Sequence, residues 1–303
     1  MERKITSRRI SKFTRRALGD PETHLQNIMK KPILTQRDKQ VLLSVYYQRC
    51  LTTEQIAELH FRYDKHGNVN TQALVITRRR LRKLFDNGLI DRFFIDVGEN
   101  NGSSQAHVVL DQLGARVVAG LLNLRMEDIQ WRYEMNQTRL PYLEHMVKIN
   151  QFFIELLRKA REKDDEVVSI LTENHVRHEF TYHGKKVVFN PDGYGQYWHG
   201  DEGFHFFLEL DNGTMTPKTF ERKHQRYARY YASGEWETYY ENFPLILTVT
   251  TSEERAQQLQ RTIAKVDNTD TVWLFASEEK IRADVLGAVW WHIRKKDPVS
   301  LFD

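Results

Sequence analysis

The chain has 303 residues, of which 28% are charged and 40% hydrophobic, and a formal net charge of +4. This length fits about two globular domains, and no apolar run approaches the ~20 residues of a membrane-spanning helix. The single cysteine, Cys50, excludes an intramolecular disulfide framework and a cysteine-based zinc site, and we expect it to be buried. Because no apolar segment follows the basic N-terminus as in a secretion signal, we expect a cytoplasmic protein with no membrane partner.

The beginning of the chain is strongly basic. Its first sixteen residues contain seven lysines and arginines and a single acidic residue, Glu2. We expect residues 1–30 to form a flexible basic leader. Such a leader is either a solvated segment or an arm that contacts phosphate groups.

Residues 31–125 are predicted to form a winged helix-turn-helix domain. Three helical segments come first: Thr35 caps the first, Thr52 and Gln55 form a capping box at the second, and Gly88 closes the third. Two strand-like runs, LIDRFFIDV and QAHVVL, follow on either side of the polar segment ENNGSS, and a further helix comes next. In this order of elements the third helix enters the major groove of DNA and the loop between the strands forms the wing.

The third helix, LVITRRRLRKLF, is the predicted DNA-binding element. Its apolar residues recur at core spacing, whereas its cations include pairs at i,i+4 spacing, which destabilise an isolated helix. Their clustering therefore favours a polyanionic partner, double-stranded DNA, over the alternative of an ordinary solvated face. The predicted DNA contacts are Arg78, Arg79, Arg80, Arg82 and Lys83.

A connector over residues 126–141 leads to a second domain over 142–303. This domain is predicted to begin with a long helix and to continue with a strand, a hairpin and the very apolar strand FHFFLELD, which we expect in the centre of a sheet. We interpret GYGQYWHGDEG as a hairpin tip, and Thr251 with Glu254 as the capping box of a later helix. Late strands alternate with helices, so the second domain is predicted to be a mixed-sheet α/β domain and the chain a two-domain α+β protein.

Acidic residues end two of the predicted strands. Asp192 follows a proline in NPDGYG, and Glu209 and Asp211 lie two residues apart, on one face of a strand, in FHFFLELDNGT. Carboxylates delivered from adjacent strands can hold a hard divalent cation such as Mg²⁺ against a phosphodiester. Asp192 and Glu209 are therefore the candidate metal ligands. The alternatives are a degenerate site that binds DNA without cutting it and a structural pair of acids.

These motifs and their order resemble the replication-relaxation family of plasmids and mobile elements. That family joins an N-terminal winged helix to a PD-(D/E)xK nuclease-like domain of the restriction-endonuclease-like fold. The matching residues are Pro191–Gly193, Glu209–Thr214, Lys223 and Tyr227, with His145 and Asn150 in the early helix.

The resemblance implies a catalytic set of Asp192, Glu209, Asp211 and Lys223. Asp211 stands where the superfamily normally has lysine. Lys223, with Lys218 as the second choice, is the candidate for a lysine that has moved to the following helix.

Three functions are compatible with the sequence. The preferred one is a DNA-binding accessory protein of plasmid or mobile-element replication or transfer, with other replication or transfer proteins of the same element as partners. The second is a Mg²⁺-dependent DNA endonuclease with Asp192 and Glu209 as metal ligands. The third is a dimeric winged-helix transcriptional regulator, and self-association as a homodimer is compatible with all three.

Overall fold

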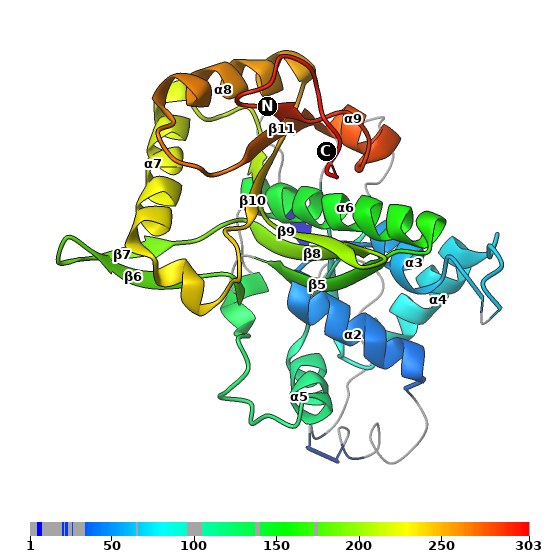
Figure 1. The fold of residues 1–303 in the computed structure, drawn as a ribbon. Helices are drawn as coiled ribbons and strands as arrows, with labels where there is room; N and C mark the ends of the chain where they lie inside the picture. The colour runs from blue at the N-terminus through cyan, green and yellow to red at the C-terminus, as the bar shows by residue number, and fades with distance from the viewer. Residues whose placement is uncertain are drawn as a thin grey trace. The chain divides into compact units, whose positions relative to one another are not determined.

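The computed structural model describes residues 5–7, 20, 22–23, 26, 34–64, 66–95, 105–136, 140–172 and 175–302. The chain divides into two compact units, Met1–Asn150 (unit 1) and Gln151–Asp303 (unit 2). Helices and sheets occur in both units, so the protein is of the mixed α+β class (Figure 1). Most of the predicted leader and the predicted wing loop lie outside the described residues.

Unit 1 contains a four-stranded antiparallel sheet in the order β1-β3-β4-β2, together with helices. The predicted order of three helices, two strands and a helix is found, whereas two further short strands, one inside the predicted leader and one between the first two helices, were not expected. Its elements are β1 (Ile5–Ser7), α2 (Gln36–Gln48), β2 (Leu51–Thr52), α3 (Thr53–His60), α4 (Ala73–Asp86), β3 (Ile90–Ile95), β4 (His107–Leu110), α5 (Gln112–Leu121), η2 (Tyr133–Asn136) and the first part of α6 (Leu140–Lys163).

Side-chain caps fix the starts of the first two long helices, as the sequence predicts. At α2 the Asp38 backbone N–H donates to Thr35 Oγ1 at 3.2 Å, and the Thr35 N–H donates to the Asp38 carboxylate at 2.8 Å. Thr52 and Gln55 make the same reciprocal pair at α3, at 3.2 and 3.1 Å. Each pair satisfies backbone donors that a helix N-terminus leaves free.

Cys50 lies in a small apolar cluster with Phe93, Val109 and Leu143. It is buried, as expected, and burial raises the pKa of its thiol to about 12. A thiol with so high a pKa is a poor nucleophile, so Cys50 serves packing rather than chemistry.

Unit 2 is a layered domain around a mixed six-stranded sheet. The order is β12-β11-β10-β9-β8-β5, in which β9, β10 and β11 are parallel and the remaining neighbours antiparallel. The strand β9 lies inside the sheet, as its apolar sequence predicts. The elements after α6 are β5 (Glu166–Thr172), β6 (His178–Tyr182), β7 (Lys185–Phe189), β8 (Gly193–His199), β9 (Glu202–Asp211), α7 (Pro217–Ser233), η4 (Glu235–Thr238), β10 (Leu245–Thr250), α8 (Glu253–Val266), β11 (Trp273–Ser277), α9 (Glu278–Asp284) and β12 (Trp291–His292).

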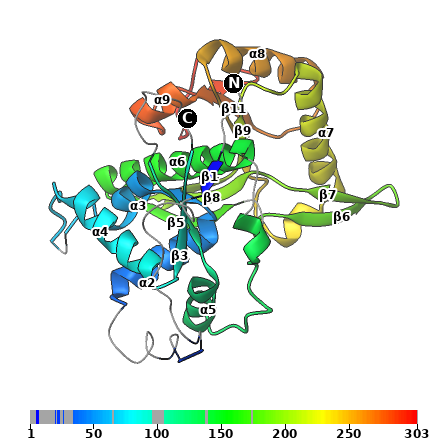
Figure 2. The same cartoon turned by 180° about the vertical axis from the view of Figure 1, so that it is seen from behind.

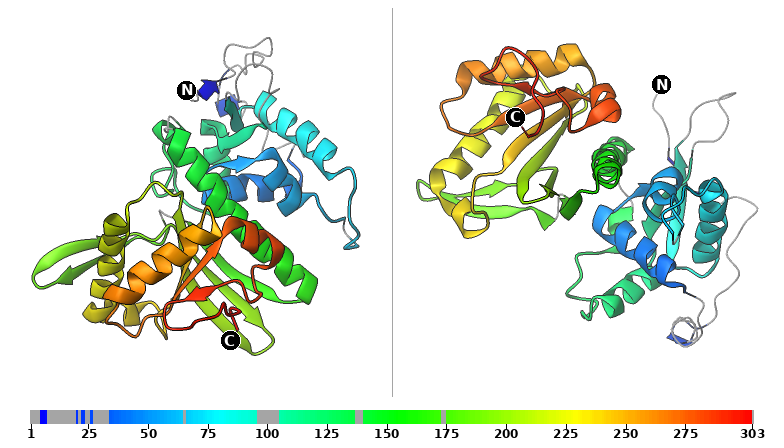
Figure 3. Two further views of the ribbon diagram at one scale, coloured as in Figure 1. Left: turned by 90° about the horizontal axis from the view of Figure 1, so that it is seen from above. Right: turned by 45° about the vertical axis from the view of Figure 1, so that its right-hand side comes forward.

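Helices cover both faces of this sheet (Figure 3). The crossovers α7 and α8 connect the parallel strands on one face, where Phe207 and Phe220 join a single apolar cluster. The part of α6 that belongs to unit 2 covers the other face, where Phe152 packs against Phe206 with ring centroids 5.7 Å apart. Alternate residues of β9 therefore point to opposite layers.

Two expectations for unit 2 were wrong. GYGQYWH is the strand β8 rather than part of a hairpin tip, and the turn to β9 comes after it, at Gly200. The glycines of β8 serve close packing, because a Cβ atom on Gly195 would lie 2.4 Å from the Phe206 ring. The cap of α8 is Ser252, which accepts from the Arg255 N–H at 3.2 Å, rather than Thr251.

Within the described chain, none of the helices has the length and apolarity that crossing a membrane requires.

Candidate functional site

The acidic residues of NPDGYG and of the following strand meet at one point of unit 2. Asp192 directly precedes β8, and the β8–β9 register places Gly193 opposite Leu208. This register brings Asp192 beside β9, where its Oδ2 accepts a hydrogen bond from the Leu210 N–H at 2.8 Å. Glu209 projects from β9 toward the layer that contains α7, so the two carboxylates predicted to come together do so.

The helix α7 supplies the other two members of this cluster. Lys223 forms an ion pair with Glu209, and its Nζ lies 3.7 Å from Asp192 Oδ2. Tyr227, one turn further along the same face, donates its hydroxyl proton to Glu209 Oε1 at 2.5 Å. Glu209 is 1% exposed and the Lys223 side chain 21%. The ammonium group of Lys223 therefore joins the two carboxylates that the sequence assigns to a metal.

Burial controls the protonation of this cluster. It raises the pKa of Glu209 to about 8; the Lys223 ammonium opposes the rise and the Asp192 carboxylate adds to it. For Lys223, burial alone would lower the pKa, but the Asp192 and Glu209 carboxylates outweigh it and raise the pKa above its ordinary value. Lys223 is therefore a permanent cation, while Glu209 is the group whose charge responds to pH.

Asp211 belongs to a different contact. It is 1% exposed, and Arg255 Nε and Nη2 lie 2.6 and 3.3 Å from its two carboxylate oxygens. Arg255 Nη2 also donates to the Met215 carbonyl at 2.6 Å. This contact ties the first turn of α8 to the segment between β9 and α7. The predicted catalytic set thus separates into the Asp192–Lys223–Glu209 cluster and a structural Asp211–Arg255 pair.

Asn150, which carries the resemblance, and Lys218, a candidate site residue, take structural or exposed positions. Asn150 is fully buried in unit 1 and donates to the carbonyls of Gln48 and Cys50 at 3.1 and 2.7 Å. Lys218, the second candidate for the displaced lysine, is exposed near the start of α7. Arg255 was missed, because nothing local in the sequence indicates a partner 44 residues away.

The residues at the acidic cluster, as arranged, do not fit a Mg²⁺ ion. Mg²⁺ requires oxygen ligands in near-octahedral geometry, whereas here a lysine ammonium lies within reach of both candidate ligands. Across the ranges that the structure describes, no three His, Cys, Asp or Glu side chains are grouped so that they could hold a metal ion. The cluster is therefore an internal charge network that links β8, β9 and α7.

The predicted DNA-binding helix of unit 1 has both paired and exposed cations. Arg80 forms an ion pair with the buried Asp38, with its Nε 2.9 Å from Asp38 Oδ1, and Arg82 Nε lies 2.9 Å from Asp86 Oδ2. The remaining cations are exposed, and no ion pair of theirs is found in the described part of the chain: Arg78, Arg79 and Lys83.

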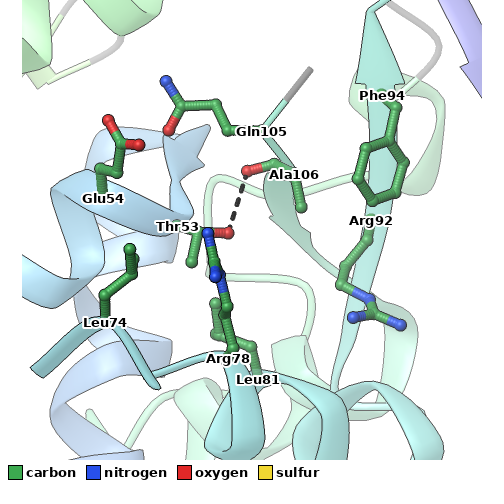
Figure 4. Close-up of a pocket in the computed structure, with 9 residues that line it drawn as sticks. All are labelled: Thr53, Glu54, Leu74, Arg78, Leu81, Arg92, Phe94, Gln105 and Ala106. Atoms are coloured by element: carbon green, nitrogen blue, oxygen red, sulfur yellow. Dashed lines mark hydrogen bonds between the residues drawn. The ribbon is translucent and has the colours of Figure 1, made fainter. Parts of the chain in front are cut away.

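A cavity of about 550 Å³ opens beside α4. It lies between the first turn of α3, α4 and the β3–β4 pair, and Arg78 rises into it from α4, with Arg92 on its far side (Figure 4). The Arg92 guanidinium carbon lies 4.3 Å from the centre of the Phe85 ring, which positions this cation over an aromatic face. Thr53 anchors the cavity wall by donating its backbone N–H to the Ala106 carbonyl at 3.0 Å.

Comparisons with known proteins give a match to one family. The replication-relaxation family matches residues 42–246, which is more than half of the chain and includes both α4 and the acidic cluster. No curated protein and no solved structure matches the chain. The chain therefore belongs to the replication-relaxation family, and membership suggests a role in plasmid or mobile-element replication.

Proposed function

We propose that this protein is a DNA-binding accessory factor of plasmid or mobile-element replication or transfer, in which unit 1 acts as a winged helix. The observation that carries the proposal is the exposed set Arg78, Arg79 and Lys83 on α4, which follows α3 in helix-turn-helix order. Like charges crowded on one helix repel one another unless a polyanion compensates them. A duplex backbone supplies that compensation.

The cavity beside α4 supports this assignment. Two arginines, Arg78 and Arg92, line a space between the helix and the strand pair that would carry the wing. In a winged helix this is the side from which helix and wing approach the groove and the backbone. Glu54 also lines the cavity, and its carboxylate would repel a phosphate group. We therefore assign the phosphate contact to the side of the cavity that the two arginines line.

Salt dependence of DNA binding tests the proposal. The triple variant Arg78→Gln, Arg79→Gln, Lys83→Gln should bind a mixed-sequence duplex more weakly than the wild type. The slope of log Kobs against log salt concentration should become shallower by about 2–3, because each lost phosphate contact contributes about 0.9. Fluorescence anisotropy with a labelled duplex between about 50 and 200 mM salt measures both quantities.

A control variant with the same loss of charge distinguishes the loss of a particular DNA-binding surface from a general effect of lower net charge. The matched variant is Arg62→Gln, Arg125→Gln, Arg132→Gln, whose three cations are exposed elsewhere in unit 1. Equal slopes for the two triple variants would refute the assignment to α4.

Cleavage is not part of the proposal, because Lys223 joins the candidate metal ligands Asp192 and Glu209. Nicking of supercoiled plasmid in Mg²⁺ or Mn²⁺, abolished by Asp192→Ala, would instead establish the endonuclease alternative.

A further inference from the structure

The helix α7 of unit 2 carries a row of exposed cations on the side away from its core contacts. They follow one another at i,i+4 and i,i+3 spacing and therefore share one face of the helix. None of the four has an ion pair within the part of the chain that the structure describes. We call this row the α7 stripe: Lys218, Arg222, Arg226 and Arg229.

The cations of α6 in unit 2 provide a contrast, because two that are only partly exposed are paired with carboxylates. On α6, Arg158 Nε lies 3.0 Å from Glu155 Oε2, and Arg158 Nη1 lies 2.6 Å from Glu162 Oε1. Lys159 Nζ lies 3.3 Å from Asp284 Oδ1. On α7 the first turn contains no acidic residue, although a helix N-terminus favours anions over cations such as Lys218. Lys218 therefore lies where the helix dipole disfavours a cation, and the α7 stripe as a whole holds like charges at spacings where they repel.

The opposite face of α7 excludes insertion of this helix into a lipid bilayer. An amphipathic helix binds a membrane by inserting its apolar face. On α7 that face is already buried in the apolar core of unit 2 through Phe220, Tyr227 and Tyr230. Only the charged side is available, and it suits a hydrated polyanion.

We propose that the α7 stripe is a second DNA-backbone contact, built into unit 2. At a rise of 1.5 Å per residue the stripe spans roughly 16 Å of helix axis, and a duplex carries one phosphate per about 1.7 Å of its own axis. Phosphates are thus available to all four cations without any particular base sequence. The contact adds affinity rather than sequence specificity.

The stripe lies beside the acidic cluster on the same helix. Lys223 follows Arg222 directly, but it points inward to Asp192 and Glu209. The β6–β7 hairpin lies against α7 (Figure 2), and its exposed Lys185 and Lys186 add positive charge to this part of unit 2. A backbone bound along the stripe would pass close to the acidic cluster, without requiring a metal.

The test uses the full-length protein and a labelled mixed-sequence duplex of about 30 base pairs. The variant Lys218→Gln, Arg222→Gln, Arg226→Gln, Arg229→Gln should bind more weakly, with a salt slope shallower by about 3–4. Its thermal midpoint should equal or exceed that of the wild type, because removing exposed like charges relieves repulsion. A retained midpoint shows that any loss of affinity does not come from unfolding.

The matched control removes four exposed cations from other parts of unit 2: Arg261→Gln, Lys265→Gln, Lys295→Gln and Lys296→Gln. This inference rests on the proposed function only in taking DNA as the partner. The role of α4 and the role of the α7 stripe can therefore be refuted independently. If the α7 variant behaves like this control while the α4 triple variant loses affinity, the stripe is not a DNA contact. If the α4 variant behaves like its own control while the α7 variant loses affinity, the proposed role of α4 fails and the stripe stands.

Discussion

At the scale of single residues, burial makes Glu209 a pH-sensitive position of unit 2. Burial raises its pKa to about 8 in the folded protein, against an ordinary value of 4.5. The folded state therefore holds the proton more tightly than the unfolded state. The resulting stabilisation is complete below about pH 4.5 and is lost as the pH rises toward about 8. Between these limits the loss is at most about 1.4 kcal/mol per pH unit.

The variant Glu209→Gln should remove this dependence. Relative to the variant, the wild type should lose free energy of unfolding steadily between pH 5 and pH 8. Urea unfolding followed by tryptophan fluorescence reports mainly on unit 2, which holds five of the six tryptophans. The readout is the difference between the two proteins in the slope of the free energy of unfolding against pH. The absolute free energies are less informative, because the variant also alters the contact with Lys223. Parallel pH profiles for wild type and variant would contradict the role assigned to Glu209, and the exposed Glu237→Gln should follow the wild type.

At the scale of elements, the Arg80–Asp38 ion pair connects α4 to the first turn of α2. Asp38 is 1% exposed and Arg80 22%. Arg80→Met leaves the Asp38 carboxylate buried with only its Thr35 contacts. We expect the free energy of unfolding of unit 1 to fall by about 2–3 kcal/mol. This is less than the ~3–5 kcal/mol for breaking a fully buried pair, because Arg80 is partly solvated.

Hydrogen exchange of α2 and α4 measures this loss locally. The neighbouring variant Arg79→Met is the control, and its effect should stay within about 0.5 kcal/mol because Arg79 is exposed. Equal protection in the two variants would show that Arg80 does not support the fold.

The two arginines also show what sequence can and cannot separate. The sequence predicts the cationic helix, but Arg79 and Arg80 are equivalent in it, and only packing against α2 makes one of them structural. Features set by neighbouring residues, such as the caps at Thr35 and Thr52, were predicted correctly. The meeting of Asp192 with Glu209 was also predicted, because both acids lie at strand ends.

Features that depend on distant residues were not predictable. The Gly195 backbone needs a glycine because of the Phe206 ring on the neighbouring strand, yet in sequence its surroundings indicate a turn. The partner of Asp211, Arg255, lies on α8, with α7, η4 and β10 between them along the chain. Both errors arise from contacts with residues on other elements, which local composition does not report.

At the scale of the whole molecule, each unit presents its own cationic helix. The α4 cations belong to unit 1 and the α7 stripe to unit 2. Two weak contacts in one chain reinforce each other, because binding of the first raises the effective concentration of the second. The predicted consequence is that affinity depends on whether a single duplex is long enough to occupy both helices.

Duplex length provides the test of this two-surface arrangement. Longer duplexes offer more overlapping binding positions to every protein, so the informative quantity is the affinity ratio of wild type to the α7 quadruple variant. This ratio should be near one on a duplex of about 10 base pairs, which accommodates one contact surface. It should rise on duplexes of about 20 to 40 base pairs, because only the wild type gains the second contact. Anisotropy titrations at fixed salt measure it, and a ratio that stays constant over this range would mean that the two helices do not act on the same duplex.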